Sequence, residues 1–218
     1  MNTQEPSRQE GFADSYIPQS EQALRPIFPF LADFVRRRIP VDLHGRTVLD
    51  LGGGTGQWLL ALMERGLGSG ILLDEDAAMV AHARRAAAAT SPPVPLLILL
   101  GRAEHIPLRN GVVDLVVSRN SMHLWHDLAR AWHEIGRILA PGGWAFLGRG
   151  FGPDLPEEVR LQVKQARQAL RNPQEPPPQE PPSPEPSTVD ALARQAGVQP
   201  VAIVPDHHSW WFLGQRLP

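Results

Sequence analysis

Cysteine is absent from this chain of 218 residues, and lysine is almost absent. Without cysteine the protein has no disulfide, no zinc–thiolate site and no thiol nucleophile. The single lysine, Lys164, lies far from any glycine-rich segment. A phosphate-binding loop of the Gly-Lys-Ser/Thr type is therefore excluded, and Schiff-base chemistry on a lysine is disfavoured.

An excess of charge and long apolar runs are lacking as well. The formal net charge is −2 and the isoelectric point is near 6.4, whereas proteins that bind nucleic acid usually carry a basic face. The chain has no run of the roughly 18 apolar residues that a membrane helix needs, and its first 15 residues are polar. We therefore expect a soluble, cytoplasmic protein without a nucleic-acid or membrane partner. No pattern indicates the oligomeric state.

Proline, by contrast, is abundant and marks the organisation of the chain. Eight of the 23 prolines fall in residues 173–186 among Gln, Glu and Ser, a composition that predicts a solvated loop rather than a packed segment. The length suits one α/β domain. The expected parts are a flexible tail (1–19) and a single domain (20–218) with a helical cap (20–45), a central core (46–150) and the proline-rich loop (173–186).

Short apolar runs alternate with longer segments of helical periodicity from residue 47 onward. This alternation predicts an α/β fold with a doubly wound, mostly parallel, Rossmann-like sheet. The expected strands are 47–51, 70–73, 95–100, 112–118 and 144–148, followed by an antiparallel pair, 201–204 and 209–213. Acidic capping boxes at Asp154 to Glu157 and at Ser187 to Asp190 predict the starts of two late helices.

A glycine-rich turn follows the first expected strand. Its pattern is Asp-x-Gly-x-Gly-x-Gly, carried by Asp50, Gly52, Gly54 and Gly56, with Gly53 between them. Glycine lets the backbone approach a bound nucleoside closely. The dinucleotide pattern fails because Gln57 stands where it needs its third glycine. An acidic residue at the strand end suits a ligand with a positive charge and would repel a pyrophosphate.

Together these motifs resemble those of class I S-adenosylmethionine-dependent methyltransferases, in the small-molecule, methyltransferase type 11-like group. The resemblance runs from about residue 47 to 148 and includes 101–108, 112–118 and 138–143. It implies a methyltransferase that binds S-adenosylmethionine and acts on a small-molecule substrate. Asp74, at the end of the second strand, is the implied acceptor of the ribose hydroxyls.

The segment that begins at Gly101 resembles the part of the family that binds adenine. The family usually has aspartate at the position of Arg102, so base recognition must rest on the Ala103 backbone, on Glu104 or on stacking by Arg102. The predicted cofactor-binding residues are Asp50, Gly52, Gly53, Gly54, Gly56, Asp74, Glu75, Arg102, Ala103, Glu104 and Arg119.

The loop after the fourth strand carries the candidate catalytic groups. His123 or His126 could act as general base if the acceptor is a hydroxyl or an acidic carbon. No metal site is predicted, because His123, His126 and His133 lack further ligands at fitting spacing. Residues 16–38 and 120–125 are expected to form a lid over the acceptor. The alternative hypothesis is a non-catalytic cofactor-binding or scaffold protein of the same fold.

Overall fold

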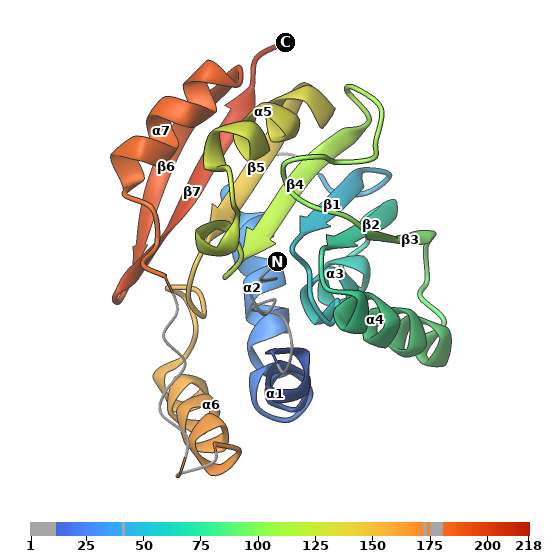
Figure 1. The fold of residues 1–218 in the computed structure, drawn as a ribbon, viewed down its shortest axis with the longest axis vertical. Coiled ribbons are helices and arrows are strands. Elements are labelled where there is room, and N and C mark those ends of the chain that lie inside the picture. The colour runs from blue at the N-terminus through green and yellow to red at the C-terminus, as the bar shows by residue number, and fades with distance from the viewer. Residues whose placement is uncertain (1–11, 41, 172–173, 175–180) are drawn as a thin grey trace, which may run out of the picture.

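A seven-stranded sheet forms the centre of the molecule, with strand order β3-β2-β1-β4-β5-β7-β6 (Figure 1). The computed structural model describes residues 12–40, 42–171, 174 and 181–218. Its strands are β1 (Thr47–Leu51), β2 (Ser69–Asp74), β3 (Leu96–Leu100), β4 (Val113–Arg119), β5 (Leu139–Gly148), β6 (Val198–Asp206) and β7 (Ser209–Arg216). Strands β1 to β5 are parallel, and β7 is antiparallel to its two neighbours. The predicted Rossmann-like fold with a terminal antiparallel pair is confirmed.

Helices cover both faces of this sheet. They are α1 (Phe12–Pro18), the π-helical η1 (Gln19–Leu24), α2 (Ile27–Arg38), α3 (Gln57–Met63), α4 (Ala77–Thr90), the short 3-10 helix η2 (Met122–Leu124), α5 (Leu128–Ile138), α6 (Glu157–Ala169) and α7 (Pro186–Gln195). Side chains of α2 and α3 pack on the face that Val48 shares, and those of α5 and α7 on the face that Leu49 shares. Burial on both faces explains why the central strands are continuous apolar runs. Within the described residues, no helix is both long and apolar enough to cross a membrane.

Both predicted capping boxes are wrong. Helix α6 starts after Pro156 with no side-chain cap, because Asp154 instead accepts a hydrogen bond at 2.9 Å from Arg37. Helix α7 starts at Pro186 itself, again without a side-chain cap. Proline has no backbone N–H to satisfy and its φ is preset for a helix, so it can begin a helix without such a cap.

The N-terminal segment is helical over part of the predicted flexible tail. Residues 12–18 of the expected tail form α1, while residues 1–11 lie outside the described part. In the proline-rich segment, Pro186 begins α7, and residues 173 and 175–180 are likewise not described.

Helix α2 belongs to the core. Its buried side chains are Ile27, Phe28, Leu31, Ala32, Phe34 and Val35. The Phe34 ring lies 5.1 Å from that of Phe146 in β5 and 5.8 Å from that of Trp211 in β7, both in edge-on contact. Removing α2 would expose this aromatic cluster to water, so the expectation that residues 16–38 move as one lid is corrected. Of the N-terminal elements, α1 and η1 remain candidates for that role, and the lid role of residues 120–125 stays a prediction.

Candidate functional site

The glycine turn leaves β1 at the edge of the sheet where the parallel strands end. Gly52, Gly54 and Gly56 have φ of 69°, 55° and 80°, in the region that favours glycine. A Cβ on Gly53 would lie 2.9 Å from Asp50 Cγ, and one on Gly52 would overlap the Ser121 side chain. The turn therefore needs glycine for its positive φ angles and because the side chains of Asp50 and Ser121 leave no room for a Cβ.

Asp74 holds this turn from the neighbouring strand. Its Oδ2 accepts a hydrogen bond from the Gly54 N–H at 2.8 Å, and its Oδ1 accepts one from the Asp76 N–H at 2.9 Å. Each oxygen keeps a second lone pair for a further donor. Burial raises the pKa of the Asp74 carboxyl to about 6, although the two backbone hydrogen bonds oppose the rise. The Asp74 carboxylate is thus fixed by two backbone hydrogen bonds and can accept two more.

Asp50 and Arg119 face the same region from adjacent strands, since β1 pairs with β4. Asp50 is 2% exposed, and burial together with the charge of Asp74 raises its pKa to about 7, against the opposing charge of Arg119. Arg119 is 8% exposed. Its Nε donates to the Gly150 carbonyl at 2.9 Å, and its guanidinium lies 5.7 Å from the centre of the Phe28 ring. The site therefore holds a buried acid near a buried cation.

The residues predicted for the adenine end also come together. Arg102 Nε lies 3.5 Å from Glu75 Oε2 and 3.6 Å from Glu104 Oε2, and Arg102 is half exposed. Glu104 Oε1 accepts hydrogen bonds from the N–H groups of His126 and Asp127, at 2.7 and 3.1 Å. Burial alone would raise the pKa of Glu104. The backbone hydrogen bonds and the charge of Arg102 outweigh burial, so the pKa lies below its ordinary value. Part of Glu104 is thus occupied at the start of α5. The Ala103 side chain is 5% exposed and packs in the core.

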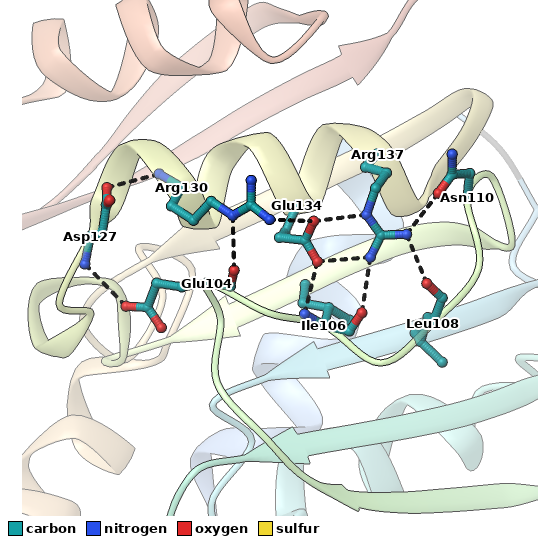
Figure 2. A network of polar contacts seen from close by, with 8 residues as sticks. All are labelled: Glu104, Ile106, Leu108, Asn110, Asp127, Arg130, Glu134 and Arg137. Carbon is teal, nitrogen blue, oxygen red and sulfur yellow. Dashed lines mark hydrogen bonds and ion pairs between the residues drawn. The ribbon is translucent and has the colours of Figure 1, made fainter.

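A network of hydrogen bonds from α5 holds the backbone of Ile106 and Leu108, which follow Glu104 in the chain (Figure 2). The sequence analysis did not predict this network. Glu134 Oε2 accepts from the Ile106 N–H at 2.9 Å. Arg137 donates to the carbonyls of Ile106 and Leu108 at 2.9 and 2.8 Å, and to Glu134 at 2.7 and 2.8 Å. The only signal in the sequence was an acid three residues before an arginine, which is common on exposed helices.

We expect Arg137→Met to lower the free energy of unfolding by about 2 kcal/mol, because Glu134 is left buried without its partner. Denaturant unfolding measures this. The matched control is Arg130→Met on the same helix. Arg130 is half exposed and lies 4.0 Å from Glu134, so its loss should cost under about 1 kcal/mol. Equal costs for the two variants would contradict the structural role of the network.

The two candidate histidines lie in different surroundings. The His126 side chain is 64% exposed, with its Nε2 3.9 Å from Glu75 Oε2. His123, in η2, lines a small cavity with Met122, Gly148 and Trp210. The role of general base stays a prediction for both.

The N-terminal elements lie against the glycine turn. Ser20 and Thr55 share a buried hydrogen bond of 2.6 Å between their hydroxyl oxygens. Glu21 Oε1 accepts from Gln57 Nε2 at 2.6 Å and lies 3.0 Å from His82 Nε2. A Cβ on Gly54 would lie 3.6 Å from Cε1 of Tyr16. Helix α1 and η1 thus cover the turn on its exposed side.

Comparison with known proteins identifies the family. Residues 49–147 match the family model of a methyltransferase domain, and 98 residues are 43% identical to an uncharacterised methyltransferase of Mycobacterium tuberculosis. Residues 49–147 are therefore a methyltransferase domain of the class I S-adenosylmethionine-dependent kind. The chain is also 36% identical over 130 residues to the malonyl-[acyl-carrier protein] O-methyltransferase of Geobacter sulfurreducens. These matches cover 45% and 57% of the chain, and 37% and 47% of the two relatives.

A solved structure agrees with the fold over the whole chain. It is that of a candidate S-adenosyl-L-methionine-dependent methyltransferase from Methanococcus maripaludis, with a TM-score of 0.77 and 22% identity. The alignment covers 100% of this chain and 98% of that one. The last helix and the β6–β7 hairpin, which lie beyond the family match, therefore belong to the same fold.

Proposed function

We propose that this methyltransferase transfers the methyl group of S-adenosylmethionine to a small-molecule acceptor. The observation that carries the proposal is the meeting of Asp50, the glycine turn and Asp74 at one edge of the sheet. The glycines leave room for a nucleoside, Asp74 has free lone pairs for ribose hydroxyls, and Asp50 offers a negative charge to an amino group. These features fit the cofactor that the family uses.

The chain's own contribution is binding, orientation and exclusion of water. When bound, S-adenosylmethionine supplies a methyl group made electrophilic by a sulfonium. Asp74 and the glycine turn would hold the nucleoside, and Asp50 the amino group. Helix α1 and η1 cover the turn and would keep water from it. Orienting two reactants can lower a barrier by about 7–11 kcal/mol, so a general base is not obligatory.

The test has a binding step and a turnover step. Calorimetry should show binding of S-adenosylhomocysteine and none of a nicotinamide dinucleotide; the reverse result would end the proposal. Formation of S-adenosylhomocysteine should then be followed across a panel of small acceptors. A malonyl thioester enters that panel because one relative is a malonyl-[acyl-carrier protein] O-methyltransferase. Cofactor binding without turnover on any acceptor would favour the non-catalytic alternative.

Replacing Asp74 should weaken binding of S-adenosylhomocysteine. We expect Asp74→Ala to cost about 1–3 kcal/mol of binding free energy, because hydrogen bonds to a charged group are lost. The matched control is Asp76→Ala. Asp76 caps α4 through the Ala78 and Met79 N–H groups, at 2.7 and 3.3 Å. Its loss should lower stability by about 1 kcal/mol and leave the affinity nearly unchanged. A folded Asp74→Ala variant with unaltered affinity would remove Asp74 from the site.

A further inference from the structure

The two edges of the central sheet differ in how they are protected against the addition of another strand (Figure 1). Strand β6, at one edge, contains Pro200 and Pro205 and has a bulge between Pro200 and Ala202. Proline and bulges both hinder strand addition. Strand β3, at the other edge, consists of leucine and isoleucine alone, with no charged residue and no proline. The β3 edge therefore lacks the protections that the β6 edge has.

The backbone hydrogen bonds of β3 show which of its groups face the open edge. The Pro95 carbonyl accepts from the Gly70 N–H of β2 at 2.9 Å. Alternate residues of a strand turn their N–H and C=O groups to opposite sides, so every second residue from Pro95 onward faces β2. The residues of β3 whose backbone groups point outward are therefore Leu96, Ile98 and Leu100.

The side chains of β3 are also exposed. Leu97 is 48% exposed and Leu100 is 55% exposed. The connection from β3 to β4, residues 101–112, is described throughout and contains no helix. One face of β3 thus lacks the covering helix that usually joins two parallel strands. A partner strand would find both backbone hydrogen-bonding groups and apolar contacts at this edge.

The charge at this edge is positive. Arg84, an exposed residue of α4, donates from Nη2 to the Ile98 carbonyl at 3.0 Å. Residues 77–103, which include α4 and β3, contain no aspartate or glutamate. A second copy of this chain, paired antiparallel about Ile98, would bring two Arg84 side chains together, which is unfavourable. An acidic strand would instead bind the Ile98 carbonyl through its backbone and the guanidinium through a carboxylate.

We propose that the β3 edge is a docking site for a protein partner that adds an extended, acidic strand to the sheet. The backbone of the partner pairs with the outward groups of β3, its apolar side chains cover Leu97 and Leu100, and its carboxylates pair with Arg84. None of these residues is among those proposed to bind the cofactor.

The test uses two synthetic peptides that differ in charge. One is a capped hexapeptide of alternating glutamate and valine, and the other has lysine in place of glutamate. Calorimetry should show that the acidic peptide binds at least about tenfold more tightly than the basic one. Amide hydrogen exchange then locates the bound strand. The N–H groups of Ile98 and Leu100 should exchange at least about tenfold more slowly in the complex, whereas those of Leu97 and Leu99, which already face β2, should change little.

Arg84→Glu should weaken binding of the acidic peptide about tenfold, because an attractive charge becomes a repulsive one. The matched control is Arg85→Glu, which makes the same change of charge at the next residue of α4. Successive helix residues lie about 100° apart, so Arg85 is on the side of α4 away from the buried Met79, Val80 and Ala83. Its replacement should change the affinity less than about twofold.

Equal binding of the two peptides would overturn the proposal, as would binding that leaves exchange at Ile98 and Leu100 unchanged, or failure of both peptides to bind. Sedimentation of the protein without peptide tests the alternative occupant. A dimer in which these two amides are already protected would assign the edge to a second copy of the chain, which also overturns the proposal. If Arg84→Glu fails to fold, the measurements on the wild-type protein decide.

Discussion

The affinity for S-adenosylhomocysteine is expected to fall as the pH drops below about 7, and to be about 50-fold lower at pH 5 than at pH 7 through the protonation of Asp50 alone. In the free protein, burial and the nearby Asp74 raise the pKa of Asp50 to about 7. An ammonium bound beside Asp50 favours the ionised carboxylate, so binding below pH 7 must release a proton. Calorimetry in buffers of different ionisation enthalpy would measure both the affinity and the number of protons released.

Two variants isolate the group responsible. Asp50→Asn should remove the pH dependence between about pH 6 and 8, whereas Asp74→Asn should keep it but shift it to lower pH, because the charge of Asp74 contributes to the raised pKa of Asp50. An affinity that is constant from about pH 5.5 to 8 in the wild-type protein would contradict the role given to Asp50.

The same carboxyl should give the free protein the opposite trend in stability. A folded-state pKa raised above the unfolded value means that the folded chain holds more protons between about pH 4 and 7. The free energy of unfolding should therefore decrease as pH rises through this range, and Asp50→Asn should flatten the decrease. A free energy of unfolding that falls with rising pH, together with a ligand affinity that rises, would indicate a buried carboxyl that ionises when a cationic ligand binds.

Asp206→Ala is expected to lower the free energy of unfolding by about 3–5 kcal/mol, the cost of leaving a buried charge without its partner. Asp206 is 3% exposed, and its Oδ2 accepts from the Gly152 N–H at 2.7 Å and from Trp211 Nε1 at 3.1 Å. Its Oδ1 lies 3.5 Å from Arg160 Nη2, and Arg160 is itself 5% exposed. Denaturant unfolding, with the slope checked for two-state behaviour, measures the loss.

The matched control for this prediction is Asp190→Ala. Asp190 forms an ion pair of 2.8 Å with Arg194 on the exposed side of α7, and such pairs contribute under about 1 kcal/mol. Adding Arg160→Met to Asp206→Ala should recover part of the loss, because it removes a buried guanidinium whose remaining charged partner is the exposed Glu157, at 3.7 Å. If Asp206→Ala lowers the free energy of unfolding no more than Asp190→Ala does, the buried Asp206–Arg160 pair does not stabilise the fold as proposed.

The cluster of Asp206 and Arg160 also supports the proposed cofactor site. Gly152, which Asp206 holds, follows Gly150 by two residues, and the Gly150 carbonyl anchors Arg119. A loop loosened by Asp206→Ala would therefore let Arg119 shift as well. The contact between the β6–β7 hairpin and the site passes through the backbone of this loop.

Several elements could be predicted because their causes are local. The run of apolar residues at Thr47–Leu51 is a strand in the structure with the expected bounds, and the glycines after it have the positive φ that their lack of a Cβ permits. Asp50 and Asp74 could be assigned to one edge because parallel strands all end on the same side of a sheet. The family resemblance rests on these same local patterns.

Other expectations failed because distant residues competed for the groups involved. Asp154 was expected to cap α6, but Arg37, more than a hundred residues away, takes its carboxylate. Glu104, one of three alternatives for adenine recognition, stays a prediction, although its Oε1 accepts two backbone hydrogen bonds at the start of α5. The apolar spacing of α2 predicted a helix of a cap over the site. Only the packing of its Phe34 on Phe146 and Trp211 shows that α2 belongs to the core.

By itself, then, the sequence determined the order of strands and helices, the glycine turn and the two acidic residues beside it, because hydrophobic periodicity and backbone sterics act over a few residues. Only the tertiary structure decided how the polar groups are shared. It joined Arg137 to the segment around Ile106, tied Asp206 to Arg160, and left Arg119 buried with an unbound donor next to Asp50. These pairings depend on which strands and loops become neighbours, and on the low dielectric that burial creates around them, neither of which is written in any short stretch of sequence.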